Sequence, residues 1–270
     1  MPELPEVEIA RENLERWLVG RRIARARVAD ARMRGGQSRR RVEGALSGAS
    51  VRAVSRRGKF LLLDLGAKRA KIVAHLGMTG RFVQQSLSEA LPRFARATLD
   101  LGRGGRVVYC DARRFGQFRL LDRLEERRIE ALGVEPLGPE FTPKTLLGIT
   151  RASPSPIKIL LMDQRRIAGV GNIQAAEALF LARIHPGRKS RSLEAAEVSR
   201  LVRSLRRTLL REIERYRSGR DAYFYEGGEA DFQVYARGGE PCPRCRSPIV
   251  RFAQGGRSTY FCPRCQKAEP

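Results

Sequence analysis

Four of the five cysteines in this 270-residue chain lie in two identical C-P-R-C motifs near its end. Cys242 and Cys245 form the first pair, and sixteen residues separate it from Cys262 and Cys265. Two such pairs are the ligand set of a tetrahedral zinc site, in which each pair supplies a knuckle and the residues between them form a hairpin. Two disulfides are the alternative, but they need an oxidising compartment, and the acidic start of the chain is unlike a signal peptide. We therefore expect one structural Zn²⁺.

The first residues, MPELPEVE, combine an amine with two carboxylates. Removal of Met1 is expected because the next residue, Pro2, is small, and it exposes a secondary amine. Such an amine attacks a sugar C1′ and forms an iminium (Schiff base), which acidifies the neighbouring C–H and permits strand scission by elimination. Glu3 and Glu6 lie within one helical turn and are suited to moving protons. On these residues alone, an ordinary Pro-Glu helix start is an equal explanation.

Charge and composition point to the partner. Lysine and arginine number 53 against 29 aspartates and glutamates, a net charge of +24, and such a surplus indicates a polyanion, most simply nucleic acid. A hydrophobic fraction of 42% is enough for a core, and no apolar run has the length of a membrane span. With only two histidines, a Ser-His-Asp triad is nearly excluded.

The elements that must position these groups change character along the chain. An amphipathic helix is predicted from about Pro5 to Leu18 and ends at Gly20. Short segments rich in Val, Leu and Phe follow, separated by Gly- or Arg-rich turns, which favours a β-sandwich or barrel over βαβ units. The predicted strands are 22–28, 51–56, 60–65, 71–75, 97–101, 106–110 and 117–121.

A stretch rich in proline and glycine, 133–143, marks a domain boundary. Beyond it the apolar period becomes helical, which predicts helices over 142–150, 157–163, 174–182 and 193–216. The zinc hairpin ends the chain. We expect an α+β protein with three domains: a β-rich domain (1–134), a helical domain (135–234) and a zinc finger (235–270).

In combination, four motifs resemble the formamidopyrimidine-DNA glycosylase family of bifunctional base-excision repair enzymes for oxidised purines. They are MPELPEVE, the paired C-P-R-C motifs, Gly-Val-Gly-Asn-Ile at 169–173 and His-Leu-Gly-Met at 75–78. The resemblance runs from residue 1 to about 267. It implies a catalytic N-terminal domain with a helix and a two-layer β-sandwich. It also implies a DNA-binding helical domain with a helix–two-turns–helix, and a four-cysteine zinc-finger hairpin. It also implies a bacterial, cytoplasmic, nucleoid-associated monomer that acts on damaged double-stranded DNA and not on membranes.

The resemblance implies five catalytic residues. Pro2 is the Schiff-base nucleophile, Glu3 the proton donor for base release, and Glu6 its support. Lys59, in Arg-Arg-Gly-Lys-Phe, is the proton donor of β-elimination beside the lesion phosphate. Arg257, between the two cysteine pairs, contacts a phosphate and serves δ-elimination.

Five further residues are implied to contact DNA. Met78, Arg113 and Phe115 match residues that fill the gap left by an extruded base, and their types suit wedges and an acceptor edge. Asn172 ends a glycine turn whose N–H groups suit a phosphate at a helix start. Lys158 matches a lysine near the damaged-base pocket.

Some positions depart from the family pattern. Gln174 replaces a common tyrosine, the usual DPRRFG reads DARRFG, and the segment 218–232 lacks the typical sequence of the loop that caps the base. With these changes, the sequence does not specify which damaged base the protein recognises. Oxidised pyrimidines or another lesion are one alternative, and a damage-recognising DNA-binding protein without catalysis is another.

Overall fold

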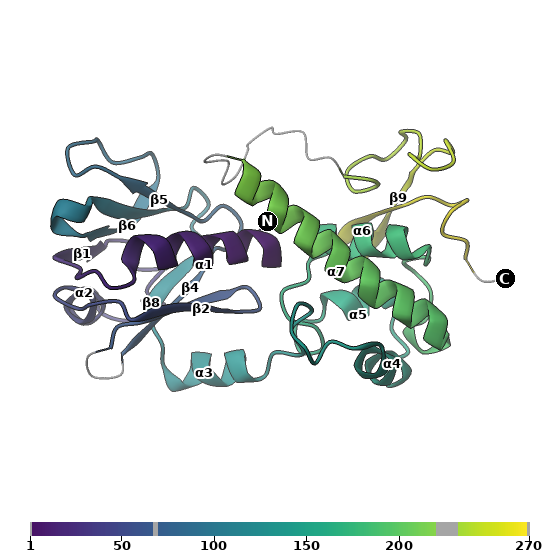
Figure 1. Cartoon of the computed structure of the whole chain (residues 1–270), viewed down its shortest axis with the longest axis horizontal. Coiled ribbons are helices and arrows are strands. Elements are labelled where there is room, and N and C mark those ends of the chain that lie inside the picture. The colour runs from purple at the N-terminus through teal and green to yellow at the C-terminus, as the bar shows by residue number, and fades with distance from the viewer. Residues whose placement is uncertain (1, 67–69, 220–231, 269–270) are drawn as a thin grey trace. The chain divides into compact units, whose positions relative to one another are not determined.

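The computed structural model describes residues 2–66, 70–219 and 232–268 (Figure 1). The chain divides into two compact units, the first formed by Met1–Ala131 and the second beginning at Leu132. The division falls just before the stretch rich in proline and glycine. The predicted separation of a finger domain at 235 stays a prediction. Within the described ranges, no helix has both the length and the apolar character needed to span a membrane.

Unit 1 contains two four-stranded antiparallel sheets, which confirms the expected β-rich half. One sheet has the strand order β1-β6-β7-β5, with β1 at Arg25–Val28, β6 at Ala95–Asp100, β7 at Arg106–Cys110 and β5 at Arg81–Gln85. The other has the order β2-β3-β4-β8, with β2 at Ala53–Arg57, β3 at Phe60–Asp64, β4 at Lys71–His75 and β8 at Gln117–Leu120.

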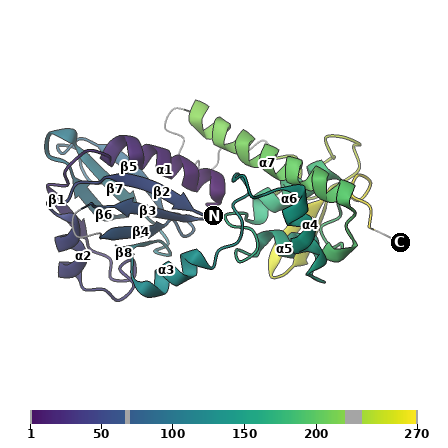
Figure 2. The same cartoon turned by 60° about the horizontal axis from the view of Figure 1, so that its bottom comes forward.

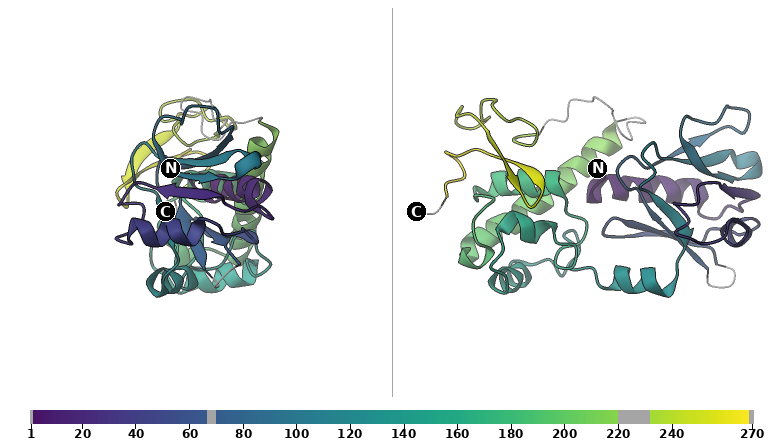
Figure 3. Two further views of the ribbon diagram at one scale, coloured as in Figure 1. Left: turned by 90° about the vertical axis from the view of Figure 1, so that its left-hand side faces the viewer. Right: turned by 180° about the vertical axis from the view of Figure 1, so that it is seen from behind.

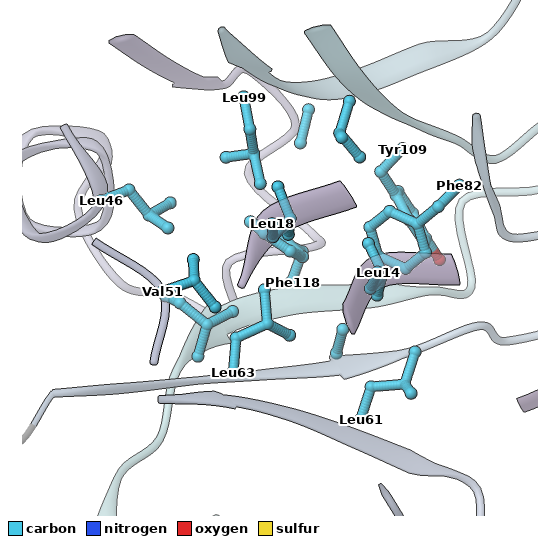
Figure 4. Packing of buried hydrophobic residues seen from close by; sticks show 14 of the residues in the cluster. Leu14, Leu18, Leu46, Val51, Leu61, Leu63, Phe82, Leu99, Tyr109 and Phe118 are labelled. Carbon is cyan, nitrogen blue, oxygen red and sulfur yellow. The ribbon is translucent and has the colours of Figure 1, made fainter. Parts of the chain in front are cut away.

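A single hydrophobic core lies between the two sheets (Figure 4). Phe82 and Tyr109 contribute to it from one sheet, and Phe118 from the other. Helix α1 (Leu4–Leu18) inserts Leu14 and Leu18 into the same core, and both side chains are fully buried. Burying an apolar side chain of this size contributes about 2 kcal/mol, so these two leucines hold the C-terminal half of α1 in the core. Val7, nearer the start of the helix, belongs to the same core.

The sequence pattern does not predict three elements of unit 1. Helix α2 (Arg39–Leu46) buries only Val42 and Leu46, and helix α3 (Arg123–Glu130) buries only Glu125 and Ile129. Strand β5 buries one residue, Phe82. Each helix buries two of its eight residues and the strand buries one of five, which is too few to give a hydrophobic period in the sequence. Contacts with the rest of the unit therefore determine these elements.

Unit 2 is mainly helical and confirms the four predicted helices. They are α4 (Pro143–Arg151), α5 (Ile157–Met162), α6 (Asn172–Ala182) and α7 (Ala195–Ser218) (Figure 2). Thr142 caps α4 by accepting the N–H of Thr145 at 3.1 Å. The 24-residue α7 packs its apolar stripe against α4 and α6 and leaves its arginine-rich side outward.

The finger adds an antiparallel hairpin to unit 2. Strands β9 (Val250–Gln254) and β10 (Arg257–Phe261) pair directly around a two-residue turn. Strand β10 packs against α6 (Figure 3). A two-stranded hairpin is at best marginally stable by itself, so this one depends on α6 and on the cysteines beyond its ends.

Candidate active site and nucleic-acid interface

The start of α1 fixes the residue next to the N-terminal amine. Pro2 and Glu3 are buried, Glu3 to 2% exposure. The carboxylate of Glu6 accepts the Glu3 N–H at 2.9 Å, and the Glu3 carboxylate accepts the N–H of Glu6, which completes a capping box. Removal of Met1, which the sequence leads us to expect, would place the Pro2 amine beside these two carboxylates, the groups that nucleophilic attack and proton transfer require.

Lys59 sits in the two-residue turn between β2 and β3. Gly58 takes a φ of +55°, the conformation that the first position of such a turn requires. Arg56 braces this turn against α1, since its guanidinium bonds Glu8 at 2.6 Å and the carbonyl of Gly58 at 2.9 Å. Burial raises the pKa of Glu8, but Arg56 and Arg11 outweigh it and leave the pKa below its usual value. Glu8 is thus an anion that holds the turn.

The three predicted gap-filling residues lie on two neighbouring connections. Residues 76–80 join β4 to β5 and carry Met78, which is half-buried. Residues 111–116 join β7 to β8 and carry Arg113 and Phe115, both exposed. The Arg113 guanidinium lies 5.2 Å from the centre of the Phe115 ring. An aromatic ring that is 58% exposed beside a cation is unusual for a core residue and suits insertion between bases.

His75 has a structural environment. Its Nδ1 accepts the N–H of Gly77 at 3.0 Å, and its ring lies 5.1 Å from that of Phe60. Burial, together with the charge of Lys59, lowers its pKa to about 4. The imidazole is therefore neutral at physiological pH and helps to shape the connection that carries Met78.

Lys158 is fully buried in unit 2 and bonds to Asn172 rather than facing solvent. Its Nζ donates to Asn172 Oδ1 at 2.6 Å and to Thr259 Oγ1 at 2.6 Å. Asn172 Nδ2 donates to the carbonyl of Ser258 at 3.0 Å. Asn172 is the first residue of α6, so the network joins a helix N-terminus to the zinc hairpin. This placement favours a role for Lys158 in holding Asn172.

Replacing Lys158 with methionine is expected to weaken DNA binding about tenfold and to lower the unfolding free energy by about 1–3 kcal/mol, because Asn172 Oδ1 and Thr259 Oγ1 lose their donor. Fluorescence anisotropy with a duplex carrying a tetrahydrofuran abasic analogue, and urea unfolding, measure the two effects. Lys144→Met, at an exposed position of α4, removes the same charge and is the control. Equal losses in both variants would mean that only net charge matters.

Arg257 lies at the tip of the hairpin and is exposed. The turn before it has two glycines, Gly255 and Gly256, with φ of +57° and +71°, as tight hairpin turns of this length prefer. A Cβ on Gly255 would lie 2.5 Å from Ile159 of α5, so the tip is held close to that helix. The Arg257 side chain is exposed but lies against α5, with its Nη1 3.8 Å from Met162 Sδ.

The four cysteines of the paired motifs gather into one site. Their sulfurs lie within 4.8 Å of one another, with Cys242 and Cys265 at 4.0 Å and Cys245 and Cys262 at 3.4 Å. Sulfurs about 2.3 Å from a tetrahedral zinc are about 3.8 Å apart, so the set fits one structural Zn²⁺. None of the five cysteines forms a disulfide, and the fifth, Cys110, is buried in β7 of unit 1.

Glu177 is a buried structural residue that the sequence interpretation missed. This buried carboxylate on α6 accepts three backbone N–H groups, from Gln233, Val234 and Tyr235, each at 2.9 Å. Burial raises its pKa despite these bonds. It anchors the chain where it enters the finger.

The predicted capping segment 218–232 falls almost wholly outside the described residues.

A charged residue on an otherwise apolar helical stretch was the available signal for Glu177. Residues 172–182 read NIQAAEALFLA, in which Glu177 is the one ionisable residue. Gln174, which departs from the family pattern, is also buried on this helix. For Glu8 no comparable signal exists, because its partner Arg56 is 48 residues away.

Comparison with known proteins covers nearly the whole chain. The formamidopyrimidine-DNA glycosylase N-terminal domain matches residues 1–118, and the formamidopyrimidine-DNA glycosylase H2TH domain matches residues 132–223. A zinc finger found in FPG and IleRS matches residues 239–268. The matches follow one another in the order of the two units and the finger.

Individual relatives give the same result. A formamidopyrimidine-DNA glycosylase of Symbiobacterium thermophilum is 43% identical over 98% of this chain and 89% of its own length. The Lactococcus lactis Fpg bound to abasic-site DNA superposes with a TM-score of 0.88 at 31% identity, covering 98% of this chain and 100% of that one. A MutM complex with DNA containing carbocyclic 8-oxo-G also gives 0.88 at 31% identity, over 99% and 100%.

Proposed function

The chain belongs to the formamidopyrimidine-DNA glycosylase family, and from this premise we propose that Pro2 is the nucleophile with which it removes oxidised purines from double-stranded DNA. The enzyme is a base-excision repair glycosylase with AP lyase activity. We place it in the bacterial cytoplasm, on nucleoid DNA. The capping box formed by Glu3 and Glu6 carries the proposal, because it holds two carboxylates beside the amine.

Base release begins with attack by the neutral Pro2 nitrogen on C1′ of the damaged nucleotide. The N-glycosidic bond breaks, its electron pair leaves with the base, and Glu3 supplies the proton that the base takes up. The Pro2 nitrogen, now bonded to C1′, loses its proton. The C1′–O4′ bond then breaks, O4′ takes up a proton, and the nitrogen lone pair forms an iminium with C1′. Glu6 supports this step through its bond to the Glu3 N–H, which fixes the backbone between the amine and the acid.

Strand cleavage follows from the same intermediate. The iminium acidifies C2′–H, and loss of that proton expels the 3′ phosphate in β-elimination. Lys59 supplies a proton at this stage, and the brace from Arg56 to Glu8 keeps its turn against α1. In a second elimination, loss of the C4′ proton from the conjugated iminium expels the 5′ phosphate, with Arg257 at that phosphate. Hydrolysis then frees Pro2.

Two groups of residues hold the DNA. Met78, Arg113 and Phe115 occupy the gap left by the extruded base, with Arg113 directed to the acceptors of the unpaired cytosine. In unit 2, Asn172 and the N-terminus of α6 bind phosphate. Lys158 acts through Asn172.

Borohydride trapping tests the function. A duplex with 8-oxoguanine opposite cytosine is expected to give a covalent complex, and mass spectrometry is expected to map the adduct to Pro2. Parallel duplexes carry formamidopyrimidine, thymine glycol, an abasic site or no damage, and the undamaged duplex is the control. Borohydride reduces the iminium, so only a Schiff-base enzyme is trapped.

Each outcome has a distinct meaning. No adduct on any duplex, with Met1 removed, would overturn the proposal in favour of a non-catalytic DNA-binding protein. Trapping on thymine glycol in preference to 8-oxoguanine would keep the chemistry and change the substrate to oxidised pyrimidines. An adduct on another residue would reject Pro2 alone.

A further inference from the structure

The two connections that carry the gap-filling residues run side by side between the sheets. Strand β4 pairs with β8, and β5 pairs with β7, so both connections leave one neighbouring pair and enter the other. At one end of the connections, His75 of β4 pairs with Gln117 of β8. At the other end, Arg81 of β5 pairs with Cys110 of β7. Residues 76–80 and 111–116 are therefore neighbours at both ends, and between the ends a Cβ on Gly77 would lie 2.5 Å from the backbone of Phe115.

A buried carboxylate joins the two connections. Asp111 is fully buried, and its Oδ1 accepts the hydroxyl of Thr79 at 2.5 Å and the N–H of Arg113 at 3.2 Å. Its Oδ2 accepts the N–H of Gly116 at 2.7 Å. The Thr79 hydroxyl also accepts the Arg113 N–H, at 3.0 Å. Both ends of the loop around Arg113 are thus bonded to one ion and, through Thr79, to the other connection.

Close packing removes the remaining freedom. Buried Tyr109 donates its hydroxyl to the carbonyl of His75 at 3.1 Å, and burial with the nearby charge of Asp111 raises its pKa, so it stays a donor. A Cβ on Gly80 or Gly116 would lie 2.1 or 1.8 Å from the same hydroxyl. Neither connection can shift without displacing this side chain.

A second carboxylate holds the loop from its other side. Arg114 has a left-handed backbone, φ +59°, and its guanidinium bonds Asp30 at 2.6 and 3.2 Å. This turn points Arg114 away to Asp30, while its neighbours Arg113 and Phe115 remain exposed. At position 112 the chain has alanine where the family pattern has proline, so side-chain bonds, and not a proline ring, restrain the loop.

We propose that Asp111, bonded to Thr79, is a positioning residue that presents Met78, Arg113 and Phe115 as one preformed wedge for base extrusion. The inference rests on the proposed gap-filling role of those three residues. Extruding a base costs a few kcal/mol, and a wedge that is already ordered avoids a further ordering cost during that step. Asp111 itself is fully buried, so we assign it a role through the two connections and not through contact with DNA.

Asp111→Asn tests the proposal because it keeps the size of the side chain but has only one oxygen that can accept hydrogen bonds. In the wild type, both carboxylate oxygens accept them. Single-turnover excision of 8-oxoguanine opposite cytosine is expected to fall about 10- to 100-fold, the range for losing a hydrogen bond to a charged group. Cleavage of a duplex with a preformed abasic site, which has no base to unstack, is expected to change less than about threefold. The ratio of the two rates is the readout.

A fluorescent base reports the wedge itself. With 2-aminopurine next to the lesion, insertion of Phe115 unstacks the reporter and raises its emission, and Asp111→Asn is expected to slow that rise. Thr79→Val, which removes one hydroxyl, is expected to shift the ratio in the same direction by a smaller factor, and it serves if the asparagine variant does not fold. Glu125→Gln, a buried carboxylate on α3, is the control whose ratio stays at the wild-type value.

Arg113→Ala distinguishes a failure of the gap-filling function from a failure of the positioning role of Asp111. If it leaves both rates unchanged, the gap-filling function fails. If Arg113→Ala lowers the excision-to-lyase ratio while Asp111→Asn and Thr79→Val keep the wild-type ratio, or lower both rates equally, the positioning role of Asp111 is overturned. A wild-type enzyme inactive on 8-oxoguanine would reject the proposed function before either variant is considered.

Discussion

Insertion of one glycine between Met1 and Pro2 is expected to lower excision of 8-oxoguanine at least about 1,000-fold and to abolish the borohydride adduct on Pro2. Met1 is still removed before glycine, but the Pro2 nitrogen becomes an amide and the nearest amine moves by about 3.8 Å. An amide nitrogen is no nucleophile, and a displaced amine loses the alignment that covalent catalysis needs. Single-turnover excision and peptide mapping of trapped complexes measure the effect.

The insertion leaves the capping box in place, so binding is the control. Glu3 and Glu6 keep their sequence relation, and affinity for the tetrahydrofuran duplex is expected to stay within about threefold of the wild-type value, since the phosphate contacts are unchanged. Thermal unfolding of the two proteins should coincide. Excision at the wild-type rate by the extended protein would mean that another group attacks C1′, with Lys59 the first candidate to map.

Loss of zinc is expected to weaken DNA binding about 100-fold while the fold of unit 1 persists. Without the ion, the two-stranded hairpin loses the link between its ends. Arg257 then loses its fixed turn, and Asn172 and Lys158 lose Ser258 and Thr259. Two charge-assisted contacts at about 1.4 kcal/mol each give the stated factor. Cys262→Ser, with the zinc content, anisotropy and circular dichroism measured on one sample, tests this expectation.

Cys110→Ala is the matched control. This cysteine is buried in β7 of unit 1 and belongs to neither motif, so zinc content and affinity are expected to remain at wild-type values. Full affinity in zinc-free Cys262→Ser would show that the finger does not hold DNA. Collapse of the whole protein would show that the finger supports the core of unit 1 as well.

Local spacing in the sequence is enough to specify the zinc site and the start of α1. A C-x-x-C pair brings two sulfurs to one knuckle whatever the rest of the chain does. Likewise Glu3 and Glu6 are three residues apart, so the helix itself forms the capping box. Long periodic segments such as 193–216 are also predictable from local spacing. Apolar residues at every third or fourth position share one face only in an α-helix. The family motifs then supply the chemistry.

Only the tertiary structure decides how the other polar groups are used. Lys158 matches a DNA-site lysine, yet its ammonium is buried against Asn172 and Thr259, which is 101 residues away. Asp111 reaches Thr79 across 32 residues, and Glu8 reaches Arg56 across 48. A buried charge is stable only where its partners converge. That convergence depends on how the sheets cross and how the hairpin docks on α6, and no local pattern in the chain encodes it.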